Sequence, residues 1–378
     1  MLIYDYYISL PYGKDYMTIA FYLSPESYMC PIIVTDTVIS DSSGTPFHGI
    51  ATRDDFSLSQ NQIIDNVLFR KYFIPNGRTA ISFAGNVGTI EDFLDYAELI
   101  TSDFETPRPL KLLADRAANY RAGSINVLSC LCLPEKHAMH KVKPDHVAEW
   151  RVEGVGLCAV IGSGASEISE SIVRMSGSFL HLNAPEHYLA EATAIGVCID
   201  SLRRELYFSQ QQNKDESWGG ILEYIIYDRS KTRWTRQPKT AYFFYELDLD
   251  DLTKPPQRIS KSFYYEPGYN NGFLYVASKT EAYCSFVLYP IRPIYPKYLE
   301  LEVIDWQQWK PDRLAFCMVG RKGGEGSSVG SVNYVGSWKT SEISELDHKY
   351  ESDVLILHPK GEKFEKFLLD GIKALTLD

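Results

Sequence analysis

Apolar residues along the chain form short runs, and their spacing predicts strands and helices in a definite order. Two apolar runs flank a polar turn at residues 24–27, which predicts a hairpin over about residues 18–40. The second run ends on Asp36, although a lone charge at the end of so apolar a strand is costly to bury without a partner. A further buried strand is predicted at Thr79–Gly85.

Helical spacing follows this strand directly. Thr89 with Asp92 resembles a capping box at the start of the helix. A second helix, two strands at Ser124–Leu133 and Val155–Gly162, and further helices come next. The most regular helix has one apolar face, made by Tyr188, Ala192, Ile195, Ile199, Leu202 and Leu206. Helices in consecutive pairs between groups of strands favour stacked antiparallel sheets with outer helix layers over an alternating βαβ sheet.

The pattern changes near Asp250–Arg258, where two prolines indicate a boundary. Beyond it the chain alternates apolar runs of strand length with turns, and it closes with a helix near residues 363–375. We therefore predict two domains, residues 1–250 and a β-rich region over residues 255–378.

Composition narrows the class of protein. The 378 residues carry a net charge of −11, which argues against non-specific binding to nucleic acid or to an anionic membrane. The N-terminus lacks the pattern of a secretory signal, and no apolar run is long enough to span a bilayer. Seven cysteines spread through apolar runs indicate reduced core thiols, so we expect a cytoplasmic protein without cofactor.

Four short motifs in this order carry a resemblance. They are the hairpin "MTIAFYL…IIVTDTVIS", the strand and helix "SFAGNVGTIEDFLDYAE", the turn "VIGSGAS", and "DESWGG" before a strand. Together residues 17–250 resemble the N-terminal-nucleophile hydrolases, of the type of proteasome β-subunits and the peptidase subunit of the bacterial heat-shock protease. The resemblance implies an αββα four-layer sandwich, which belongs to the α+β class, with the β-rich C-terminal region as an addition.

In that family the residue at the mature N-terminus attacks an amide carbonyl, and its own α-amine acts as the base. The resemblance assigns this role to Thr18 and assigns Asp36, Ser163 and Asp215 to the site around it. A lysine paired with the hairpin aspartate keeps the site positive and lowers the pKa of the nucleophile.

The chain departs from this pattern in three places. Met17 aligns best with the nucleophile, and Thr18 follows one residue later. The family has a lysine near the position of Asn66, whereas here Arg70 and Lys71 lie further along. Trp218 replaces a small polar residue that usually supports the site.

We therefore expect a partly erased site in a protein that acts by binding or assembly, as a homo-oligomer or with a ring partner. The alternative is a threonine-type peptidase or amidohydrolase, released by removal of residues 1–17. A contact between Lys71 and Asp36 would favour the enzyme.

Each site residue also has a purely structural interpretation. Thr18 can be an ordinary β-branched strand residue, and Asp36 and Asp215 can be strand-end carboxylates that accept backbone hydrogen bonds. Ser163 can be a turn residue that starts a helix. Cys130 and Cys132 point to one face of a strand near His137 and His140, but the spacing is not that of a structural zinc site, so we expect no metal.

Overall fold

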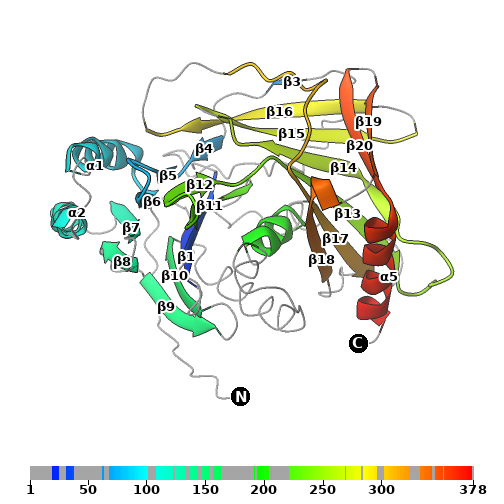
Figure 1. Ribbon diagram of the computed structural model, residues 1–378, viewed down its shortest axis with the longest axis horizontal. Coiled ribbons are helices and arrows are strands. Elements are labelled where there is room, and N and C mark those ends of the chain that lie inside the picture. Colours follow the sequence, from blue (N-terminus) through cyan, green and yellow to red (C-terminus); the bar gives the residue numbers. More distant parts are fainter. Residues whose placement is uncertain are drawn as a thin grey trace.

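The computed structural model is mostly β, and its described residues form four sheets. It describes residues 19–24, 31–37, 62–63, 68–100, 108–121, 124–132, 137–142, 147–152, 156–162, 191, 194–203, 206, 221–268, 270–281, 284–295, 302–322, 333–342, 345–351 and 353–376. Figure 1 shows the helices α1 and α2 at one end of the molecule and α5 at the other.

A six-stranded antiparallel sheet lies near the middle of the molecule, in the order β12-β11-β2-β1-β10-β9. Strand β1 (Ile19–Ser24), one of the two central strands, is buried on both faces. Ile19, Phe21 and Leu23 belong to one core cluster, and Ala20 and Tyr22 belong to another. The strands of this sheet are β1 (Ile19–Ser24), β2 (Ile32–Asp36), β9 (Val147–Val152), β10 (Gly156–Gly162), β11 (Leu222–Asp228) and β12 (Arg233–Arg236).

A four-stranded antiparallel sheet packs on one face of the six-stranded sheet. Its strands are β5 (Tyr72–Phe73), β6 (Thr79–Gly85), β7 (Ile125–Cys132) and β8 (His137–Val142). Two helices, α1 (Val87–Ile100) and α2 (Arg108–Ala118), cover its other face. The predicted capping box is wrong, because Asn86 accepts the Thr89 N–H with its side chain at 3.1 Å and so caps α1.

The third sheet has eight strands and curls like a half-barrel, in the order β18-β17-β13-β14-β15-β16-β3, with β4 also paired to β16 (Figure 1). β13 pairs in parallel with β17, and β16 pairs in parallel with β3 and β4. The strands are β3 (Gln62–Ile63), β4 (Leu68–Arg70), β13 (Thr240–Asp248), β14 (Gln257–Glu266), β15 (Gly272–Lys279), β16 (Cys284–Pro293), β17 (Arg313–Arg321) and β18 (Asn333–Lys339).

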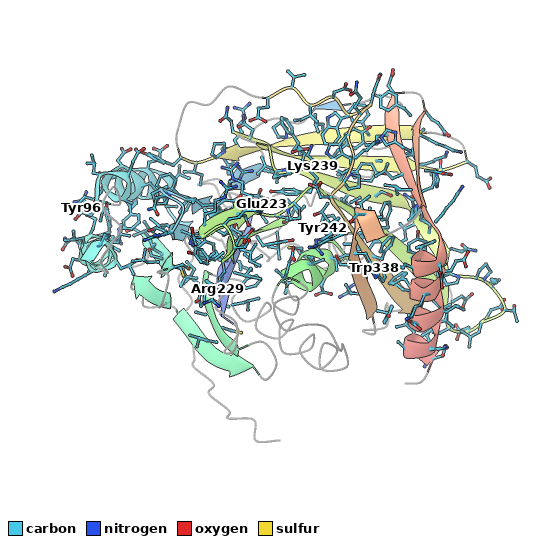
Figure 2. All side chains as sticks on the ribbon, in the orientation of Figure 1. Tyr96, Glu223, Arg229, Lys239, Tyr242 and Trp338 are labelled. Carbon is cyan, nitrogen blue, oxygen red and sulfur yellow. The ribbon has the colours of Figure 1, made fainter. Side chains whose placement is uncertain are left out.

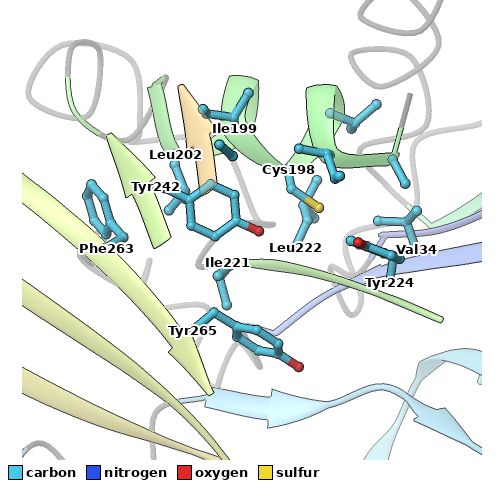
Figure 3. Close-up of a cluster of buried hydrophobic side chains, with 14 of the residues drawn as sticks. Val34, Cys198, Ile199, Leu202, Ile221, Leu222, Tyr224, Tyr242, Phe263 and Tyr265 are labelled. Carbon is cyan, nitrogen blue, oxygen red and sulfur yellow. The ribbon is translucent and has the colours of Figure 1, made fainter. Parts of the chain in front are cut away.

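Helical residues 194–203 lie between the six-stranded and eight-stranded sheets. Cys198, Ile199 and Leu202 pack there against residues of both sheets, such as Tyr224 and Phe263 (Figure 3). The outer face of the eight-stranded sheet is covered by a hairpin and a helix. These are β19 (Glu345–Glu351), β20 (Val354–Lys360) and α5 (Glu362–Thr376), preceded by the short η2 (Thr340–Glu342).

The predicted αββα four-layer sandwich is wrong. The largest sheet is the curled eight-stranded one, and helical residues 194–203 form an inner layer between two sheets instead of an outer layer. The apolar face of this helix predicts one packing partner, but Val197 on another side is also buried. Apolar periodicity shows that a face is buried and does not show which sheet buries it.

The proline-rich stretch near residue 255 connects β13 to β14, which are paired neighbours in one sheet. Strands from both sides of it contribute to the same core around helical residues 194–203. The division into residues 1–250 and 255–378 stays a prediction about independent folding. Within the described ranges, no helix is long and apolar enough to cross a membrane.

Candidate functional site

Asp36 ends β2 and is fully buried. Its Oδ1 atom accepts the backbone N–H of Ile19, the first residue of β1, at 2.9 Å. The neighbouring Thr37 ties the same strand end to β11, because its hydroxyl donates to the Ile221 carbonyl at 3.0 Å. The carboxylate therefore lies directly beside the start of β1.

Lys71 supplies the opposite charge. Its Nζ donates to Asp36 Oδ1 at 2.8 Å, and both side chains are buried, with exposures of 2% and 0%. Burial lowers the pKa of Lys71 below its ordinary value of 10.5, and the attraction of Asp36 offsets this only in part. The site thus holds a cation that can exchange a proton more readily than a surface lysine.

The backbone around Lys71 joins three sheets. Residues 68–70 form β4 and pair with β16 of the eight-stranded sheet, whereas residues 72–73 form β5 and pair with β6 of the four-stranded sheet. The Phe69 N–H donates to the Thr37 carbonyl at 2.7 Å, next to the six-stranded sheet. Lys71 is the residue at which the chain changes sheets.

A second buried ion pair follows from the preceding residue. Arg70 donates to Glu223 Oε1 through Nε at 3.4 Å and through Nη2 at 3.3 Å. Glu223 comes from β11, lies opposite Thr35 in the β2–β11 register, and is located near the middle of the molecule (Figure 2). Two oppositely charged pairs therefore connect the segment of residues 70–71 to β2 and β11.

Three of the predicted site residues, Thr18, Ser163 and Asp215, lie outside the described residues, as do Met17 and Trp218. The chain neighbours of the first two, Ile19 and Gly162, are direct partners in the β1–β10 register. Gly162 has a φ of 101°, a backbone region that favours glycine and accounts for this glycine of the Gly-Ser-Gly motif. Asp36 is the one predicted site residue whose surroundings the structure describes.

Lys71 was not among the predicted site residues, although a contact between it and Asp36 was named as a sign of an enzyme. The family pattern predicts a lysine near Asn66, and the spacing from the hairpin to Lys71 is longer. The sequence near Lys71 did contain an indication of this role. Phe69 and Phe73, two residues to either side, suggest burial, and a buried lysine is costly unless it has a partner. The same argument applies to Asp36, whose carboxylate also needs a partner of opposite charge when it is buried.

Cys130 and Cys132 are both buried in the core between the four-stranded and six-stranded sheets, with their Sγ atoms 3.9 Å apart. The prediction that both face one side of their strand is confirmed. No group of three or more His, Cys, Asp or Glu side chains that could hold a metal occurs among the residues that the structure describes.

Comparison with known protein families finds no family model that matches the chain, and comparison with curated proteins finds no match either. The chemistry of the site is therefore argued from its own residues. A buried ammonium next to a strand start can lower the pKa of an amine or hydroxyl there, because a nearby positive charge favours the deprotonated form.

Proposed function

We propose that the protein is an amidohydrolase of the N-terminal-nucleophile type, active in a chain that begins at Thr18. The Thr18 Oγ attacks an amide carbonyl, and its free α-amine accepts the hydroxyl proton. The C–N bond then breaks, and the proton passes to the leaving amine. Water hydrolyses the remaining ester, which returns the free hydroxyl.

The main support is the Lys71–Asp36 pair beside the first residue of β1. Covalent geometry sets the Cα of residue 18 about 3.8 Å from that of Ile19. The Ile19 N–H donates to the same Asp36 oxygen that Lys71 contacts, so the charged pair lies directly beside the start of β1. The role of Lys71 would be to hold positive charge there and lower the pKa of the Thr18 amine and hydroxyl.

A non-catalytic role by binding or assembly had rested on two main departures from the family pattern. One was the lack of a lysine near the aspartate, and the ion pair at 2.8 Å removes that objection. The other was the uncut chain before Thr18, and this determines the experiment. Because a general base contributes about 10²–10⁴ in rate, a chain with Thr18 inside a peptide bond should be nearly inactive.

The test compares full-length protein with a chain whose N-terminus is Thr18, produced by removing a cleavable leader and checked by intact mass. Hydrolysis is followed on a mixture of peptides with mass spectrometry of the products, since the substrate is unidentified. We expect cleavage by the Thr18 chain alone.

Three variants of the Thr18 chain are matched controls. Thr18→Ala removes the nucleophile and should abolish cleavage, and Thr18→Ser retains a hydroxyl and should keep part of it. Lys71→Met removes the positive charge beside the start of β1, so it should lower the rate strongly. Equal cleavage by Thr18→Ala and by the parent chain would contradict the nucleophile, and no cleavage by any chain would favour binding or assembly.

We further propose that the protein works in the cytoplasm and assembles with copies of itself. The cysteines in the described ranges carry free thiols, and most are buried, which suits a reducing compartment. Assembly is implied by the family resemblance alone. Mass measured by light scattering at several protein concentrations tests it.

A further inference from the structure

We propose that Arg70, Glu223 and Tyr265 are positioning residues for Lys71, so that the β14–β16 part of the eight-stranded sheet sets the geometry of the Lys71–Asp36 pair. Its consequence for catalysis rests on the proposed function. The positioning itself concerns only residues described in the structure and can be measured without any activity.

Arg70 is held by several groups from different parts of the chain. Besides Glu223, its Nη2 donates to the Pro267 carbonyl at 2.9 Å and its Nη1 donates to the Asn270 carbonyl at 3.4 Å. Both carbonyls belong to the connection between β14 and β15. The guanidinium also lies over the Tyr72 ring, 5.4 Å from its centre. Arg70 is therefore fixed from the C-terminal part of the chain.

Gly272 leaves the space that the guanidinium occupies. A Cβ atom at this position would lie 2.8 Å from Arg70 Nη2 and 3.2 Å from the Glu266 carbonyl oxygen. Any larger residue would push Arg70 away from Glu223, so the sequence of β15 is fitted to this side chain.

Tyr265 connects the carboxylate to β14. Its hydroxyl donates to Glu223 Oε1 at 2.6 Å, and the ring is fully buried. Figure 3 shows the ring near Ile221 with its hydroxyl directed away from the helix of Ile199 and Leu202. Glu223 thus binds a side chain from β14 and the residue next to Lys71 at once.

The backbone also links the segment before Lys71 to the eight-stranded sheet. Leu68, Phe69 and Arg70 pair in register with Ile291, Arg292 and Pro293 of β16. Lys71 follows at once, and its carbonyl accepts the Phe83 N–H at 3.2 Å. A shift of β4 along β16 would move the ammonium away from Asp36, and misplacement by about 1 Å can cost 10²-fold in rate.

The mildest probe is Tyr265→Phe, which removes one hydroxyl and keeps the ring. Tyr264→Phe is its matched control: Tyr264 is the next residue of the same strand, is equally buried, and accepts the Leu357 N–H at 3.1 Å from β20 on the outer face of the sheet. Gly272→Ala is the second probe, because it displaces Arg70 without changing any charge.

The measurement is the pH titration of the Lys71 ammonium by NMR in lysine-labelled full-length protein, with the signal assigned by its loss in Lys71→Met. Asp36 of β2 pairs with Lys71, and Arg70 and Tyr72 are its neighbours in the chain, whereas Glu223 of β11 and Tyr265 of β14 interact with Arg70. We expect Tyr265→Phe and Gly272→Ala to move the midpoint up toward 10.5, since a loosened lysine gains water, and Tyr264→Phe to leave it unchanged.

In the Thr18 chain the same two variants should lower kcat by roughly 10-fold or more with KM nearly unchanged, because the affected group acts in the reaction and not in binding. A Lys71 midpoint that is equal in all four proteins would overturn the positioning role. A midpoint that moves as expected in a protein that hydrolyses nothing would support the positioning and contradict the proposed function alone.

Discussion

Two consecutive side chains, Arg70 and Lys71, form buried ion pairs of different character. Lys71 pairs with Asp36, and burial lowers the pKa of Lys71. Burial also opposes the charge of Arg70, but the acidic groups Tyr72, Glu223 and Tyr265 more than offset it and raise the pKa of Arg70 above its ordinary value. Burial favours the neutral form of Lys71, whereas Arg70 is permanently charged.

This difference assigns different roles to the two residues. We propose that Lys71 acts on the chemistry at the start of β1 through its positive charge. Arg70 has two backbone carbonyls, a carboxylate and an aromatic ring around it, all but Tyr72 from beyond residue 220. We propose that the C-terminal strands hold the segment of residues 70–71 and that Lys71 acts at the start of β1.

The largest effect should follow from removing the supporting strands. A chain that ends at residue 250 keeps Asp36, Lys71 and Glu223 but lacks Tyr265 and the strands β14–β17, which contribute much of the core around helical residues 194–203. We expect no cooperative thermal unfolding, measured by circular dichroism. A cooperative transition in this fragment would show that the region up to residue 250 folds by itself and would break the comparison.

Arg70→Met should be the most destabilising of the single substitutions considered. It leaves Glu223 buried with its charge unpaired, which costs about 3–5 kcal/mol, and we expect a value near the upper end. Urea unfolding measures it. The matched control is Arg116→Met, which breaks an exposed pair with Asp92 and should change the stability far less, because solvent screens that pair. Equal costs at the two positions would contradict the supporting role of Arg70.

Lys71→Met should cost less, roughly 3 kcal/mol at neutral pH, because the burial of this ammonium is itself unfavourable. The pH dependence has a definite sign. Since the folded pKa of Lys71 is lowered, the unfolded chain binds more protons in the window below 10.5, and stability from this group rises with pH there. The advantage of wild type over Lys71→Met in urea unfolding should therefore grow through this window. A decrease would contradict the lowered pKa.

The smallest difference is expected between two tyrosines. Tyr265→Phe removes a hydrogen bond to a charged carboxylate and should cost about 1.5–3 kcal/mol, whereas Tyr264→Phe removes one to a backbone N–H and should cost about 1 kcal/mol. Thermal unfolding of both variants checks the order. A larger loss of stability in Tyr264→Phe than in Tyr265→Phe would contradict the greater stabilising effect of the contact with Glu223.

Local structure could be predicted from the sequence where one period dominates. The strand Thr79–Gly85 and the helix that directly follows it are confirmed. The start of that helix was misassigned, because Asn86 and Thr89 both resemble caps and only the observed bond from Thr89 to Asn86 identifies the cap.

The arrangement of the layers could not be predicted in the same way. β13 is apolar on both faces, and such a run does not say which strands lie beside it. Its partner β17 is far along the chain, beyond the stretch interpreted as a boundary. For the site, the sequence left open whether Asp36 is a strand-end residue or part of a site, and the structure shows it buried against Lys71. Lys71 reaches it because the chain changes sheets at this residue.

The most direct test of the central claim is covalent labelling of the Thr18 chain with a β-lactone, which acylates an activated hydroxyl. Intact mass and fragmentation locate the label. We predict one label, on Thr18, and its loss in Lys71→Met with the fold retained, as judged by thermal unfolding. Equal labelling of Thr18 in Lys71→Met would contradict the role of the Lys71–Asp36 pair. The absence of a label on the Thr18 chain without further substitution would contradict the assignment of Thr18 as the nucleophile.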